Sequence, residues 1–218
     1  MARDSGAVII MPIEIAPKSV TITYDRPYFT GPKPLSGREQ VVSNSSGGWL
    51  FKYNDIPLYG SKYRTFSQYM TYLTKTSIFI YVRPLFGPNK LVNRLGGTIS
   101  TTYTLSANVI KGDTSFVANR TGTIVLQNGD FFEINGRLHR LHNIDPNIPS
   151  SGKDTFGFWP PLREAYASGT AIEITDPVCI CNMTTNSPSF SETMDMGTIM
   201  FQSIEFIEAN WPSGTLYP

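Results

Sequence analysis

The chain has 218 residues, a formal net charge of +1 at pH 7, 16% charged residues and 12% aromatic residues. A chain of this length buries a sizeable core without metal or disulfide support, and its near-neutral charge gives no field that favours nucleic acid or a membrane surface. The low charge, with 18 glycines and 16 prolines, is typical of an all-β protein with many turns.

The N-terminal segment predicts neither a membrane span nor a signal peptide. Residues 1–15 contain a short apolar stretch that Pro12 and Glu14 interrupt. Both kinds of segment need a longer apolar run than this. We therefore expect a protein without a membrane span that begins at a mature N-terminus.

A proline-rich segment separates the first predicted strands. Residues 19–25 alternate between apolar and polar side chains, which predicts a strand. Residues 28–40 contain several prolines and glycines, and proline has no N–H to donate to a sheet. This segment is therefore either an extended arm or a loop folded back on its own domain. Two further strands are predicted at residues 40–43 and 49–55, with a turn between them.

Residues 61–76 are the best candidate for a helix. Apolar side chains recur there every three or four residues, at Tyr63, Phe66, Tyr69, Met70 and Leu73. Such an aromatic stripe can line a ligand site, but at helical spacing it is more often a core face. A buried strand is expected directly after it, at residues 77–85.

Residues 110–176 differ in texture from the rest of the chain. Short apolar runs alternate there with turns that begin at glycine, which is typical of a small β-barrel. We predict a mainly β protein in which residues 1–109 and 177–218 form a discontinuous main domain, a β-sandwich or tube-like β domain with one helix. Residues 110–176 form a small β-barrel-like module inserted into it.

The two cysteines are predicted to be buried side chains. Cys179 and Cys181 lie two residues apart in a predicted strand, so both face the same side. That geometry suits a disulfide poorly, and no further metal ligand follows in the sequence. Buried cysteines behave as small apolar residues.

The sequence GDFFEINGRLHRL, residues 129–141, predicts a hairpin around an Asn-Gly turn. A two-residue loop would place Ile134 opposite Arg137, whereas a three-residue loop would pair Glu133 with Arg137. The second register matches opposite charges and apolar partners, so we prefer it. The charged residues are then explained as cross-strand partners.

No catalytic, cofactor or metal site is predicted, and we expect a protein that is not an enzyme. His139 and His142 are the only histidines, and their spacing places them on opposite faces of a strand. That arrangement does not suit a shared metal ion. Trp159 is either a core residue or an exposed aromatic that stacks on a sugar.

Two stretches together resemble tail-tip proteins of tailed bacteriophages. The first is FTGPKPLSGREQVVSNSSGGWLFKYNDIPL, followed by the predicted helix and SIFIYVRPL. The second is LQNGDFFEINGRLHRL, followed by FWPPLREAYASGTAIEITDP. The last strand, FQSIEFIEANW, is similar to the closing strand of the same proteins. The chain thus resembles distal tail or minor tail proteins of siphophage- or myophage-like virions.

The resemblance implies a structural protein of the virion, assembled in the cytoplasm of the host bacterium. Such proteins form a homo-oligomeric ring, commonly six-fold, at the distal end of the tail tube and link the tube to hub and fibre proteins. The implied fold is a tail-tube-like β domain, with the inserted module outside the ring. No cofactor and no recognition of nucleic-acid sequence are expected.

Two other functions remain open at this point. One is a carbohydrate-binding or host-recognition module on the virion, and the other is a head–tail connector or tail terminator. The arm would supply inter-subunit contacts, and the candidate residues are Tyr28, Phe29, Pro32, Pro34, Leu35 and Arg38. On the inserted module, Trp159 and His139 are the candidate exposed surface.

Overall fold

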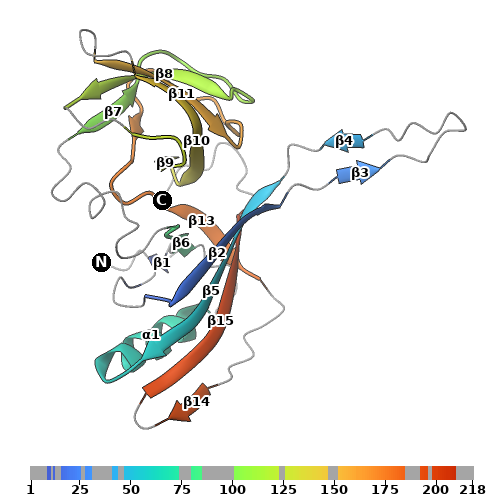
Figure 1. The fold of residues 1–218 in the computed structure, drawn as a ribbon, viewed down its shortest axis with the longest axis vertical. Helices are drawn as coiled ribbons and strands as arrows, with labels where there is room; N and C mark the ends of the chain where they lie inside the picture. The colour runs from blue at the N-terminus through green and yellow to red at the C-terminus, as the bar shows by residue number, and fades with distance from the viewer. Residues whose placement is uncertain are drawn as a thin grey trace, which may run out of the picture.

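The protein is mainly β, as the sequence predicts, and its described residues form two large sheets, one small sheet and one helix. The structure, a computed structural model, describes residues 9–10, 12, 16–25, 28–30, 41–43, 47–73, 80–84, 101–122, 126–146, 152–184, 192–195 and 198–209. The two large sheets lie one beyond the other along the molecule (Figure 1).

The larger sheet has seven strands in the order β1-β6-β13-β15-β5-β2, with β14 pairing onto β15. Its strands are β1 (Ile9–Ile10), β2 (Ser19–Asp25), β5 (Gly48–Leu58), β6 (Ile80–Val82), β13 (Cys179–Met183), β14 (Glu192–Asp195) and β15 (Thr198–Glu208). All pairings are antiparallel except β1 with β6. Segments from both ends of the chain therefore build one sheet.

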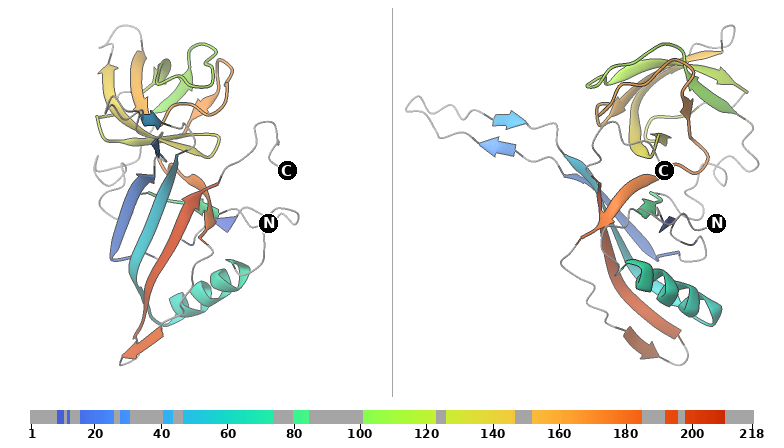
Figure 2. Two further views of the ribbon diagram at one scale, coloured as in Figure 1. Left: turned by 90° about the vertical axis from the view of Figure 1, so that its right-hand side faces the viewer. Right: turned by 180° about the vertical axis from the view of Figure 1, so that it is seen from behind.

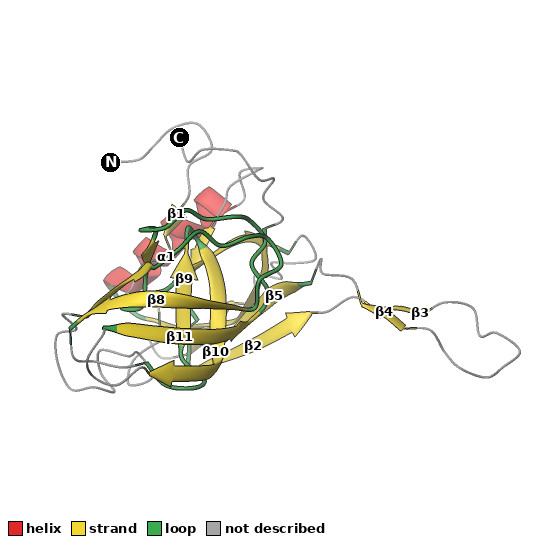
Figure 3. Ribbon diagram, turned by 90° about the horizontal axis from the view of Figure 1, so that it is seen from above, coloured by secondary structure: helices red, strands yellow, loops and turns green. Residues whose placement is uncertain are grey.

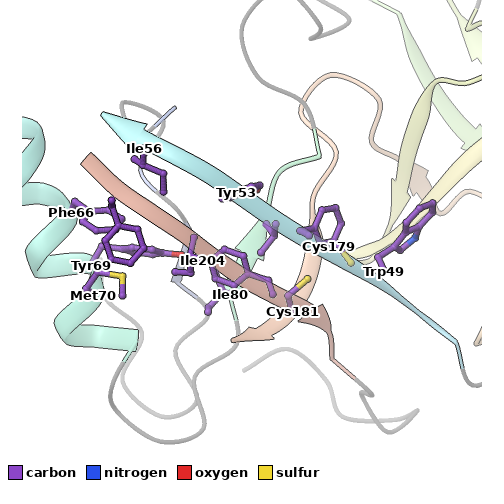
Figure 4. Packing of buried hydrophobic residues seen from close by; sticks show 14 of the residues in the cluster. Trp49, Tyr53, Ile56, Phe66, Tyr69, Met70, Ile80, Cys179, Cys181 and Ile204 are labelled. Carbon is purple, nitrogen blue, oxygen red and sulfur yellow. The ribbon is translucent and has the colours of Figure 1, made fainter. Parts of the chain in front are cut away.

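Helix α1 (Ser61–Leu73) covers one face of this sheet (Figures 1 and 2). Phe66, Tyr69 and Met70 are buried against it, which confirms that the aromatic stripe is a core face. Figure 4 shows these side chains packing with residues of β5, β6, β13 and β15. The predicted residues 74–76 of the helix lie outside the described part of the chain.

The second large sheet has six strands in the order β12-β7-β8-β11-β10-β9. They are β7 (Thr102–Leu105), β8 (Ser115–Thr121), β9 (Phe131–Ile134), β10 (Arg137–Pro146), β11 (Lys153–Trp159) and β12 (Ala171–Ile172). Two backbone hydrogen bonds of 2.9 Å between Glu133 and Glu173 join β9 to the segment after β12. The sheet is thus a nearly closed barrel, seen from above in Figure 3, and it encloses its own cluster of buried side chains.

The barrel begins earlier in the chain than the sequence indicates. Strand β7 lies within the segment 1–109 that we assigned to the main domain, yet it pairs with β8 and β12 of the barrel. The division of the chain into two domains stays a prediction.

The third sheet is a pair of short strands, β3 (Tyr28–Thr30) and β4 (Val41–Ser43). β2 leads into β3 and β4 leads into β5, and β2 pairs with β5 as far as Asp25 opposite Gly48. The β3–β4 pair lies away from both large sheets in Figure 1, in the right-hand view of Figure 2 and in Figure 3. It therefore extends the β2–β5 hairpin outward as a two-stranded projection.

Candidate functional site

Among the described residues, no group of three or more His, Cys, Asp or Glu side chains is arranged to hold a metal ion. Cys179 and Cys181 are free and fully buried, as predicted, and burial raises the pKa of the Cys179 thiol well above its usual value. A thiol with a raised pKa is a poor nucleophile. In the part of the chain that the structure describes, α1 is too short and too polar to cross a membrane.

The hairpin at residues 129–141 does not have the register that we preferred. Arg137 lies opposite Ile134 and Leu138 lies opposite Glu133, so the loop is the two-residue alternative. Asn135 and Gly136 have φ values of +50° and +75°, and positive φ at both central residues is the hallmark of a type I′ turn. Turn geometry thus decided the register, and charge matching across the strands did not.

Glu133 and Arg137 do not face each other, and each bonds to at least one partner outside the hairpin. The Glu133 carboxylate accepts hydrogen bonds from Gly136 N at 2.7 Å and from Val178 N at 3.0 Å. Burial raises the pKa of Glu133, and these two bonds oppose the rise. Arg137 Nη1 donates to Ala209 O at 2.7 Å and to Glu208 Oε1 at 3.3 Å. Both side chains therefore tie the hairpin to the segments that flank the barrel in sequence.

The side chains of the hairpin divide between two cores. Phe131 and Leu138 pack in the cluster of the seven-stranded sheet, whereas Phe132 and Ile134 pack in the cluster of the barrel. Adjacent side chains on a strand point to opposite faces, so one hairpin can serve both cores. The barrel and the seven-stranded sheet are consequently joined by shared apolar packing.

Buried charges surround this contact. Arg163 Nη2 donates to Glu208 Oε2 at 3.1 Å, while Arg137 occupies Glu208 Oε1. The side chain of Glu208 is 1% exposed. A buried carboxylate is tolerated only when it is paired and hydrogen-bonded, and both oxygens of Glu208 meet that condition. We call residues 129–141, Arg163 and Glu208 the inter-sheet joint.

Backbone contacts complete the inter-sheet joint. The indole Nε1 of Trp49, in β5, donates to Leu138 O at 2.8 Å, and Ile180 N, in β13, donates to Gly136 O at 3.0 Å. Two different strands of the large sheet are thus bonded to the same hairpin. The arrangement fixes the position of the barrel on the seven-stranded sheet.

His139 is not on the exposed surface, so that prediction is wrong. Its side chain lies inside the barrel, 1% exposed, because the observed register turns it inward beside Phe132, on which it stacks. Nδ1 donates to Pro160 O at 2.8 Å, and Nε2 has no hydrogen-bond partner among the described residues. Burial, with Arg163 and Arg137 nearby, lowers the pKa of His139 to about 4.

Trp159 is half-buried, so neither a full core position nor a free surface position describes it. Its ring meets the ring of Tyr24 edge-on, with centroids 5.8 Å apart. Tyr24 belongs to β2, the strand that leads to the β3–β4 pair. Trp159 therefore joins the barrel to the base of the projection.

The candidate arm is only partly within the described residues. Tyr28 and Phe29 lie in β3, which pairs with β4. The other candidates, Pro32, Pro34, Leu35 and Arg38, lie outside the described residues. Sequence reasoning found this segment from its prolines but missed Arg163 and Glu208, whose partners are far away in the chain.

Comparison with known proteins does not assign the chain to a family. No protein-family model matches the chain, and no curated protein sequence matches it. The structural features that bear on function are the projecting β3–β4 pair and the inter-sheet joint.

Proposed function

We propose that the protein is a non-enzymatic structural component of a bacteriophage tail. In this proposal its copies form a ring, six-fold in the usual case, at the distal end of the tail tube. The ring connects the tube to hub and fibre proteins. The sequence resemblance to tail-tip proteins suggests this function, and one structural observation favours assembly as its mechanism.

That observation is the β3–β4 projection. It continues the β2–β5 hairpin past the point where these two strands stop pairing and lies away from both large sheets (Figure 1). A two-stranded ribbon is at best marginally stable alone in water. A projection of this kind gains stability when it orders against another surface. In a closed ring each subunit offers one surface to a different surface of its neighbour, so a neighbouring copy would supply that surface.

The inter-sheet joint supports the same proposal. Shared side chains and a buried ion network hold the barrel on the seven-stranded sheet. A ring subunit that bears load between tube and fibres needs such a fixed arrangement of its parts. An assembly built on hinged parts would not hold its shape.

Position in the virion separates this function from a head–tail connector or tail terminator. Antibodies against the barrel would label the distal end of the tail in electron micrographs if the proposal is right. Label at the head–tail junction would favour the connector instead.

A glycan array separates the proposal from a carbohydrate-binding module. Trp159 packs against Tyr24 with only part of its ring accessible, and we expect no specific glycan signal. Reproducible binding that Trp159→Leu abolishes would contradict the assignment to a purely structural role.

The oligomeric state tests the proposal itself. The purified full-length protein is expected to give a mass of several subunits and ring-shaped particles by electron microscopy. A protein that stays monomeric at every concentration, alone and with tail-tube protein, would overturn it.

A further inference from the structure

The projection leaves the body of the protein at a short segment of β2 and β5. We call Tyr24 and Asp25, with Gly47, Gly48 and Trp49, the arm base. In the last register positions of this hairpin, Tyr24 lies opposite Trp49 and Asp25 lies opposite Gly48. Tyr24 and Asp25 end β2, Gly48 and Trp49 begin β5, and Gly47 directly precedes β5. The barrel nevertheless contacts both strands of this hairpin.

The first contact is aromatic. Tyr24, on the β2 side, packs edge-to-face with Trp159 of the barrel at 5.8 Å and with Trp49 at 5.2 Å. Trp49 in turn packs edge-to-face with Phe131 of β9 at 5.8 Å. Edge-to-face pairs at these separations are favourable beyond the area that they bury. The ring of Tyr24 is therefore held between the barrel and its own sheet.

The second contact is polar and lies on the β5 side. Arg163 Nη2 donates to Gly47 O and also to Glu208 Oε2. The same carboxylate oxygen accepts a hydrogen bond from Trp49 N at 3.1 Å. One guanidinium of the barrel thus fixes the backbone of the arm base both directly and through Glu208. Hydrogen bonds to charged groups are among the stronger ones in proteins.

Only one of the two glycines of the arm base is required by this packing. A Cβ atom at Gly47 would lie 2.4 Å from Asp25 O and 2.8 Å from Cε1 of Tyr24. At Gly48 the nearest atom would be Cβ of Glu208, at 3.4 Å, which is an ordinary contact. Gly47 therefore permits the close approach of the two strands that places Tyr24 against Trp159.

We propose that the barrel acts as a clamp on the arm base and so sets the direction in which the β3–β4 projection leaves the protein. Trp159 and Arg163 are its positioning residues, one for each strand of the hairpin. The clamp itself rests on the contacts above. Its consequence for assembly rests on the proposed function, since the projection would then be presented to a neighbouring copy in one orientation.

Hydrogen–deuterium exchange of the full-length protein tests the clamp. We expect Arg163→Met and Trp159→Leu each to speed exchange about tenfold in peptides from residues 20–30 and 43–52, because each removes a contact that closes this region. Exchange in α1 and β8 should stay as in the wild type. Arg64→Met and Tyr59→Leu, exposed positions on or before α1, are the matched controls and should change nothing at the arm base.

Two results would overturn the clamp. One is unchanged exchange at the arm base in both variants. The other is faster exchange spread equally over α1, β8 and the arm base, because that pattern is a general loss of stability. Arg163→Lys, which keeps the charge but replaces the planar guanidinium with a shorter side chain, should fall between wild type and Arg163→Met.

Sedimentation of the same samples separates the clamp from the proposed function. If both hold, the clamp variants form fewer or less regular rings than the wild type. A loosened arm base with normal rings would contradict the role of the clamp in assembly and leave the proposed function intact. Absence of rings in the wild type would contradict the proposed function, while the exchange data would still decide the clamp.

Discussion

The β9–β10 hairpin of the inter-sheet joint and the β3–β4 projection are two antiparallel strand pairs that are placed in opposite ways, one between the two large sheets and the other away from them. The hairpin of β9 and β10 has side chains in two cores and bonds to β5, β13 and the residues after β15. The β3–β4 pair, in contrast, is a separate sheet of two strands. The β9–β10 hairpin fixes the position of the barrel relative to the seven-stranded sheet. The β3–β4 pair projects away from both.

This difference indicates where rigidity matters in the molecule. Burying the charges of Arg137, Arg163 and Glu208 costs desolvation energy that apolar residues would avoid. Such a network restricts the sheets to one relative position, because its geometry is satisfied in only one arrangement. A projection with a fixed base suits recognition of another surface.

Arg137→Met should have the largest effect on the joint. It leaves Glu208 with Arg163 as its remaining ion-pair partner among the described residues and removes the bond to Ala209 O. Breaking a buried ion pair on one side typically costs about 3 kcal/mol of unfolding free energy. Urea unfolding of the variant measures this loss. A loss no larger than that of Arg64→Met, on the exposed side of α1, would show that the joint contributes little.

His139 should make the stability of the protein depend on pH. The pKa of its buried ring is about 4 in the fold, against about 6.5 in an unfolded chain. Between these values the unfolded state binds more protons, so stability rises with pH from about 4 to about 6.5 and is fully present above that window. The total change is about 3 kcal/mol.

The chain offers a matched pair of variants for this titration. His139→Asn retains a donor for Pro160 O but does not titrate, so it should flatten the dependence of unfolding free energy on pH. His142→Asn, a substitution of the same type at an exposed position, is the matched control. Identical pH profiles for wild type and His139→Asn would contradict the buried, neutral state of His139.

Gly47→Ala and Gly48→Ala compare neighbouring positions of the arm base. The first forces Cβ onto Asp25 O and the ring of Tyr24, while the second meets only ordinary contacts. Overpacking of this kind costs about 2 kcal/mol, so Gly47→Ala should lower the thermal midpoint and Gly48→Ala should lower it much less. Equal midpoints for the two variants would refute the close packing of the arm base.

The ion pair of Lys52 and Glu205 should matter least. Its atoms lie 2.8 Å apart, but the side chains are 44% and 39% exposed. Pairs this accessible contribute roughly 0.5 kcal/mol. A double-mutant cycle with Lys52→Ala and Glu205→Ala measures the coupling. A value as large as that between Arg137 and Glu208 would remove the distinction between the joint and an ordinary surface contact.

Local patterns predicted the elements of the fold well. The three- and four-residue spacing in residues 61–73 predicted α1, and the alternation in residues 19–25 predicted β2. The glycine-rich texture after residue 110 predicted the barrel. These signals depend on neighbours in sequence, and such neighbours are visible without a structure.

The register and the joint were not predictable in the same way. The three-residue loop looked better because it matched Glu133 with Arg137, but their actual partners, Val178 and Glu208, come from segments after the barrel. The observed register also turns His139 toward the inside of the barrel. Long-range partners decide such details, and a single sequence does not reveal them.

Removal of the barrel would be a poor test of its role. Phe131 and Leu138 belong to the cluster of the seven-stranded sheet, so deleting residues 110–176 would expose Trp49 and its neighbours. Substitutions in the arm keep residues 110–176 in place and are the better choice.

The most direct test of the account is sedimentation velocity of the full-length protein with a substituted arm. The variant replaces the six candidate contact residues with serine, at Tyr28, Phe29, Pro32, Pro34, Leu35 and Arg38. A control carries serine at exposed Ile110 and Lys111 of the barrel. We predict that wild type and control sediment as the same oligomer and that the arm variant sediments as a folded monomer. An arm variant that assembles like the wild type would contradict the account.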